Sequence, residues 1–184
     1  MNTVIVSDIY GLTDALTRLA NEIDCCDIID PYDGVVKNFR NESTAYNSFK
    51  INVGMDAYVK HIEKQLAKIQ CNSTVVGFSA GASALWRLSE HTSSQNYIKN
   101  IVCFYPSQIR HYMNVCPVIP VDVIFPVCEA KFNVTDIGVK LSDKELVTVH
   151  KTKYLHGFMN QCSTNFSNKA YSHFSKFLDQ NKLI

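Results

Sequence analysis

The sequence predicts an α/β fold in which a mostly parallel sheet is covered by helices on both faces. Short apolar runs rich in β-branched residues alternate along the chain with stretches of helical periodicity. The short runs are apolar throughout, which is typical of strands buried on both faces. This alternation favours parallel strands joined by right-handed helical crossovers.

Each predicted element rests on its own residue pattern. The expected strands are short and mostly apolar, and they cover residues 3–6, 28–29, 74–78, 98–105, 121–127 and 146–151. The expected helices carry apolar residues on one face and cover residues 12–20, 58–70, 81–88, 134–141 and 168–178. Residues 32–54 are polar, aromatic and irregular, so we expect a long loop with one helical turn at most.

Length and composition predict one globular domain. The chain has 184 residues, of which 46% are hydrophobic and 19% charged, so one core suffices and disorder is not expected. We find no repeat, linker or low-complexity tract, which predicts a single domain over residues 1–184 without a separate cap domain.

Charge and cysteine content restrict the partners and the compartment. The net charge of +1 gives no overall field for nucleic acid, and no apolar run reaches the roughly 18 residues that span a bilayer. The N-terminus lacks a basic region before its apolar run, so we expect a cytoplasmic protein that binds neither nucleic acid nor membrane. The seven cysteines are then expected to be reduced, with Cys103 and Cys128 buried in or beside strands.

The motif that indicates chemistry is Gly77-Phe78-Ser79-Ala80-Gly81, which matches Gly-x-Ser-x-Gly. A predicted strand enters the motif and a predicted helix leaves it, which is the setting of a nucleophile elbow. The alternative is a glycine-rich turn with an incidental serine. We predict that Ser79 is a nucleophile and that the N–H of Ala80 stabilises negative charge on the reacting oxygen.

A serine nucleophile needs a base and an orienting acid. In nucleophile-elbow enzymes the order along the chain is Ser, acid, His, with the His after the last strand, and His156 fits this position. Glu129 directly follows the predicted strand 121–127, so we expect it to be the acid. Asp136, within a predicted helix, stays open as the alternative. Arg110 lies just past another strand and is a candidate for binding a substrate carboxylate.

With these residues in view, the chain resembles the dienelactone hydrolase family of α/β-hydrolases over most of its length. The resemblance is carried by Asp8-Ile9-Tyr10-Gly11-Leu12, by the Ser79 motif, and by the segments 154–160 and 166–171. It implies an oxyanion N–H from Ile9, and it places Asp8 and Tyr10 beside the substrate. The chain departs from the family in having Ser79 instead of cysteine and in lacking a Gly-x-x-Asp turn near Glu129. It also has Asn160 where the family has an arginine.

The pattern and the resemblance together predict a hydrolase for a small carboxylic ester or lactone that acts through an acyl-enzyme on Ser79. No metal or organic cofactor is implied, because the sequence shows neither a ligand cluster nor a phosphate-binding loop. A thioesterase or peptidase with the same three residues is an alternative, as is a non-catalytic binding protein that kept the fold. The sequence leaves the oligomeric state open.

Overall fold

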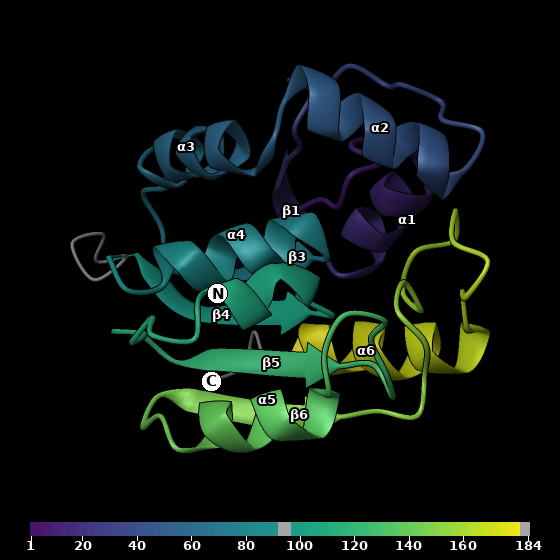
Figure 1. Cartoon of the computed structure of the whole chain (residues 1–184). Coiled ribbons are helices and arrows are strands. Elements are labelled where there is room, and N and C mark those ends of the chain that lie inside the picture. Colours follow the sequence, from purple (N-terminus) through teal and green to yellow (C-terminus); the bar gives the residue numbers. More distant parts are fainter. Residues whose placement is uncertain (92–96, 181–184) are drawn as a thin grey trace.

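A six-stranded sheet forms the framework of the protein (Figure 1). The computed structural model describes residues 1–91 and 97–180. The strand order is β2-β1-β3-β4-β5-β6, and every neighbouring pair is parallel. The strands are β1 (Asn2–Val6), β2 (Cys25–Ile29), β3 (Ser73–Phe78), β4 (Ile98–Phe104), β5 (Val121–Phe125) and β6 (Val147–Lys151). All carboxyl ends therefore meet at one edge of the sheet.

Helices cover both faces of this sheet, as the sequence predicts. They are α1 (Asp14–Glu22), α2 (Glu42–Asn52), α3 (Met55–Leu66), α4 (Ala80–Leu88), α5 (Val134–Ser142) and α6 (Asn168–Gln180), with a 3-10 helix η2 (Ser107–His111). One apolar core joins the sheet to α3, α4 and α5, and a second joins it to α1 and α6. Among the described residues no separate cap domain lies over the sheet, and no helix is long and apolar enough to cross a membrane.

Strand β3 shows why the strands read as continuous apolar runs. Its neighbouring residues Val75 and Val76 are both fully buried, and they belong to the two different cores. Because successive side chains point to opposite faces, a strand covered on both sides must be apolar at every position. The central predicted strands are confirmed for this physical reason, whereas the edge strand β2 begins at Cys25, three residues before the predicted start, because it is partly exposed and its first residues are not an apolar run.

The expected loop over residues 32–54 is wrong in part, because it contains the 11-residue helix α2. Only Ala45 and Phe49 of this helix are buried, so it shows no apolar stripe in the sequence. Asn41 caps its N-terminus, since its Oδ1 accepts a hydrogen bond from the Thr44 N–H at 2.9 Å. This capping residue is the local signal that could have located the helix.

The chain reverses its direction across the sheet at β1. From β1 it passes to β2 on one side and then returns to β3 on the other side. Ligands of open α/β sheets bind outside the carboxyl ends of the strands at such a reversal. The loop after β1 and the turn after β3, which carries Ser79, both lie there (Figure 1).

Candidate active site

Ser79 sits on a strained turn between β3 and α4. Its φ is 47° and its ψ is −105°, a backbone conformation that residues other than glycine rarely adopt. The two flanking glycines permit close packing around the turn. A Cβ atom on Gly77 would lie 2.7 Å from the Ala82 nitrogen, and one on Gly81 would lie 2.6 Å from the Val6 carbonyl oxygen. The strand-turn-helix setting predicted for the motif is therefore present.

Three side chains are joined by hydrogen bonds at this edge of the sheet. Ser79 Oγ lies 3.0 Å from His156 Nε2, and His156 Nδ1 lies 2.7 Å from Glu129 Oε1. A carboxylate only accepts hydrogen bonds, which assigns the imidazole proton to Nδ1 and leaves Nε2 to accept from the serine hydroxyl. The three residues that the sequence selected thus come together in the order serine, imidazole, carboxylate.

Separate loops position these three groups. Glu129 lies in the connection after β5, where an antiparallel bridge joins it to Phe132. His156 lies in the loop after β6, and its carbonyl oxygen accepts a hydrogen bond from Asn165 Nδ2 at 2.9 Å. The ring centroid of Tyr105 lies 4.9 Å from that of His156. The side chains of Glu129 and His156 are 10% and 27% exposed, so their hydrogen bond is largely shielded from water.

The candidate oxyanion donors border the same cavity as Ser79. This cavity has a volume of about 540 Å³, and Ile9, Ala80, Glu129 and His156 also line it. Within the described part of the chain, the N–H groups of Ile9 and Ala80 have no acceptor. Asp8 takes up the next two N–H groups of the loop after β1, since Tyr10 donates to Oδ1 at 2.9 Å and Gly11 donates to its carbonyl oxygen at 3.2 Å. The Ile9 N–H is therefore available to a ligand.

Asp8 and Tyr10 border a smaller hollow that also contains Ser79 and His156. Asp8 Oδ2 accepts a hydrogen bond from Asn160 Nδ2 at 2.6 Å, which ties the loop after β1 to the loop that carries His156. Burial raises the pKa of the Asp8 carboxyl above its ordinary value. The Tyr10 hydroxyl donates to the Cys162 carbonyl oxygen at 3.5 Å, and burial raises the pKa of Tyr10 to about 12.

Arg110 reaches the larger cavity from η2. It is half-buried, its Nη1 donates to the Ser107 carbonyl oxygen, and its guanidinium lies 6.0 Å from the Phe132 ring centroid. Among the described residues no carboxylate pairs with it. Asp136, the alternative acid, is exposed in the first turn of α5, and the carboxylate hydrogen-bonded to His156 is that of Glu129.

The structure corrects the expected burial of Cys128. All seven cysteines are free thiols, and Cys103 is fully buried, as expected. Cys128 is instead exposed and lines the larger cavity. The reason is that β5 ends at Phe125, two residues before the predicted end, so the chain has already left the core. Because Cys128 and Tyr105 follow the carboxyl ends of strands, the position of those ends could have placed both residues at the site.

Comparison with known proteins agrees with this architecture. The chain is similar to Est1E from Butyrivibrio proteoclasticus with ferulic acid bound, with a TM-score of 0.62 and 9% identity over 100% of this chain and 88% of that one. It is similar to an esterase from Pyrobaculum calidifontis, with a TM-score of 0.61 and 12% identity over 100% and 78% of the two chains. It is also similar to the dienelactone hydrolase-like promiscuous phosphotriesterase P91 from metagenomic libraries, with a TM-score of 0.59 and 12% identity over 97% and 85% of the two chains. The chain therefore has the α/β-hydrolase fold, which it shares with dienelactone hydrolase-like enzymes.

At the level of sequence, the chain is similar to the uncharacterized protein YczH of Bacillus subtilis strain 168. The two are 27% identical over 179 residues, which cover 91% of this chain and 85% of that protein. No family model matches the chain.

Proposed function

We propose that this protein is a serine hydrolase that cleaves a small carboxylic ester or lactone through an acyl-enzyme on Ser79. The observation that carries the proposal is the hydrogen-bonded series of Ser79, His156 and Glu129 at a strained strand-to-helix turn. In this proposal His156 is the general base and Glu129 orients it. The esterases among the similar structures have the same fold, which supports ester hydrolysis as the reaction class.

The first half of the reaction transfers the acyl group to the serine. His156 Nε2 takes the hydroxyl proton as Ser79 Oγ forms a bond to the substrate carbonyl carbon. The carbonyl electron pair moves onto oxygen, where the N–H groups of Ile9 and Ala80 stabilise it. When that pair returns, the bond to the alcohol oxygen breaks and His156 gives its proton to the leaving alcohol.

The second half releases the acid. His156 takes a proton from water as the water oxygen attacks the acyl carbon. The tetrahedral species then collapses, the acyl-oxygen bond to Ser79 breaks, and His156 returns the proton to Oγ. Glu129 stays ionised throughout and stabilises the imidazolium that forms in each half.

Substrate contacts and location belong to the same proposal. Arg110 is a half-buried cation without a carboxylate partner among the described residues, so we expect it to bind an anionic group of the substrate. Asp8 and Tyr10 border the hollow around Ser79 and are expected to contact the substrate there. Seven free thiols suit a cytoplasmic location.

Covalent labelling tests the central step. A fluorophosphonate should form one adduct per chain, and peptide mass spectrometry should locate it on Ser79. Ser79→Ala should abolish both the adduct and the turnover of short-chain aryl esters. Ser175→Ala, which changes a serine of α6 that donates to the Tyr171 carbonyl oxygen, should leave both intact. Turnover by Ser79→Ala at the wild-type rate, or an unlabelled wild-type protein, would refute the proposal and favour a non-catalytic role.

A further inference from the structure

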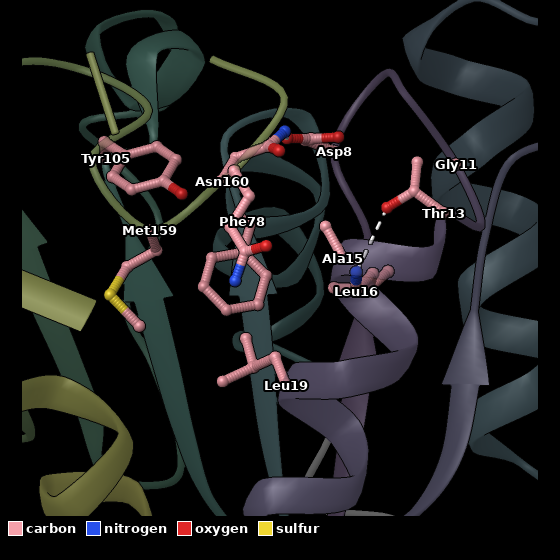
Figure 2. A pocket seen from close by; sticks show the side chains of 11 residues that line it. Asp8, Gly11, Thr13, Ala15, Leu16, Leu19, Phe78, Tyr105, Met159 and Asn160 are labelled. Atoms are coloured by element: carbon pink, nitrogen blue, oxygen red, sulfur yellow. Dashed lines mark hydrogen bonds between the residues drawn. The ribbon is translucent and has the colours of Figure 1, made fainter. Parts of the chain in front are cut away.

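A second pocket lies beside the candidate active site, between α1 and the carboxyl ends of β3 and β4 (Figure 2). We call it the Tyr105 pocket. Its walls are mostly apolar and include Leu16, Leu19, Phe78 and Met159. Thr13 holds the α1 wall in place, because its Oγ1 caps the helix by accepting from the Leu16 N–H at 3.1 Å. Helix α1 and the end of β3 thus form the apolar walls of the pocket, and loops after the strands complete it.

The Tyr105 pocket adjoins the hollow that contains Ser79 and His156. Asp8, Tyr105 and Asn160 line both spaces. The Tyr105 ring lies beside the imidazole of His156, with 4.9 Å between the ring centroids and 54° between the ring planes. A substituent on a substrate bound at Ser79 can therefore extend into the Tyr105 pocket.

The hydroxyl of Tyr105 is the unusual feature of this pocket. Tyr105 is 1% exposed, and among the described residues no acceptor is found for its hydroxyl proton, although the backbone N–H of Met159 is placed to donate to its oxygen. Figure 2 shows this hydroxyl directed into the pocket. Burial, and then the nearby charge of Asp8, hold the pKa of Tyr105 well above its ordinary value, so the hydroxyl keeps its proton and can donate it. A buried donor without an acceptor is costly and calls for a ligand.

The backbone of Tyr105 is strained as well. Its φ is 42°, in the left-handed region that bulky residues rarely adopt. Residues held in such conformations concentrate at functional sites, where the strain places a side chain. Here the strained residue directly follows β4 and sets its ring against His156 and its hydroxyl in the pocket.

The other polar groups of the pocket are already engaged. Asn160 donates to Asp8 through Nδ2 at 2.6 Å and accepts from the Cys162 N–H through Oδ1 at 2.7 Å. Asp8 accepts one hydrogen bond on each carboxylate oxygen, which leaves it able to accept another. Beside His156 the pocket therefore offers a donor on Tyr105 and an acceptor on Asp8. A hydroxyl group matches both.

The pocket has room for a small substituent. Its volume is about 20 Å³, and a group of the size of one water molecule needs roughly 10–15 Å³. A group of the size of a hydroxyl therefore fits.

We propose that the Tyr105 pocket is a subsite for a hydroxyl substituent on a short acyl group, with Tyr105 donating to that hydroxyl and Asp8 accepting from it. The substrate class is then a short hydroxyacyl ester. This proposal rests on the proposed function, because the acyl group must be held at Ser79.

The test compares esters in which a hydroxyl replaces a methyl group of the same size. Aryl 2-hydroxypropanoate is paired with aryl 2-methylpropanoate, and aryl 3-hydroxybutanoate with aryl 3-methylbutanoate. The preference is kcat/KM for the hydroxy ester divided by kcat/KM for the methyl ester of the same pair. This ratio is divided by the corresponding ratio of the rates of hydrolysis by hydroxide ion, which corrects for the intrinsic reactivity of the two esters. The wild-type protein should prefer the hydroxy ester in at least one pair. Tyr105→Phe should lower that preference by about 3- to 10-fold, the range expected for one hydrogen bond.

Tyr171→Phe is the matched control. Tyr171, on α6, also has a buried hydroxyl, which lies toward the Glu22 carboxylate, and it lines neither pocket. This variant should keep the wild-type preference. An equal loss in both variants, or a wild-type protein without preference in either pair, overturns the subsite. If fluorophosphonate labels Ser79 but the preference is absent, only this inference fails. If Ser79 is not labelled and no ester is hydrolysed, the proposed function fails and the inference fails with it.

Discussion

Replacing Glu129 by glutamine is the sharpest test of how His156 is activated. The substitution keeps the size of the side chain and removes its charge. Glutamine can turn its amide N–H toward His156 Nδ1, which now lies 2.7 Å from a carboxylate oxygen. The imidazole would then carry its proton on Nε2, which lies 3.0 Å from Ser79 Oγ and could no longer accept the serine proton.

The geometry sets the size of the expected effect. If glutamine imposes the wrong tautomer, the loss in kcat is about 10⁴-fold. If its carbonyl oxygen keeps the present hydrogen bond, only the stabilisation of the imidazolium is lost. The Glu129 side chain is 10% exposed, so water compensates little for the missing charge. We therefore expect a loss of about 10²- to 10⁴-fold, which corresponds to about 3–5 kcal/mol of transition-state stabilisation.

The assay is kcat/KM for a short-chain aryl ester, measured together with the rate of fluorophosphonate labelling and the thermal unfolding midpoint. Both rates should fall in Glu129→Gln while the midpoint stays near that of the wild type. Asp136→Asn is the control, because Asp136 is exposed on α5, and it should change the rates by less than about twofold. A loss below tenfold in Glu129→Gln would refute the role of this carboxylate. A large loss in Asp136→Asn alone would move the acid to that residue.

Two further predictions concern the walls of the larger cavity. Cys128 is exposed there, whereas burial raises the pKa of the Cys103 thiol, so a bulky maleimide should modify Cys128 and not Cys103 and should block ester turnover. If the maleimide still blocks ester turnover by the Cys128→Ser variant, this prediction is contradicted. Arg110→Lys should raise KM severalfold for esters with a carboxylate and spare neutral esters of the same size, because lysine loses the two-pronged contact. An equal change for both kinds of ester would remove Arg110 from substrate binding.

The sequence predicts most of the sheet because strands that are buried on both faces appear as short apolar runs. Strands β3 to β5 are mainly apolar, and their predicted and observed bounds differ by two residues at most. Helix α2 was missed because its burial is limited to Ala45 and Phe49, and the rest of the helix faces solvent. A helix held by so few contacts carries no periodic pattern, and only its cap at Asn41 marks it.

In the candidate site, too, the sequence predicts the residues that lie in local patterns and not the contacts between distant loops. Ser79 and His156 were selectable because each lies in a local pattern, a glycine-flanked turn and a loop after the last strand. The hydrogen bond between Asp8 and Asn160 was not predictable, because it joins loops 152 residues apart and depends on the order of the strands in the sheet. Tyr105 lies at the carboxyl end of a predicted strand, which places it at the edge of the site, but no local pattern indicates that its ring contacts His156.

The absence of a Gly-x-x-Asp turn is compatible with an acid at Glu129. An aspartate side chain is one methylene shorter than that of glutamate, so its backbone must lie closer to the histidine. In this chain the segment after β5 is held by the bridge between Glu129 and Phe132, and the guanidinium of Arg110 lies over the Phe132 ring. Glutamate is longer by one methylene, and its carboxylate reaches Nδ1 at 2.7 Å from this position. The longer side chain of Glu129 thus brings its carboxylate within hydrogen-bonding distance of His156. A shortened side chain in Glu129→Asp should then lose the contact with His156 although its charge is kept.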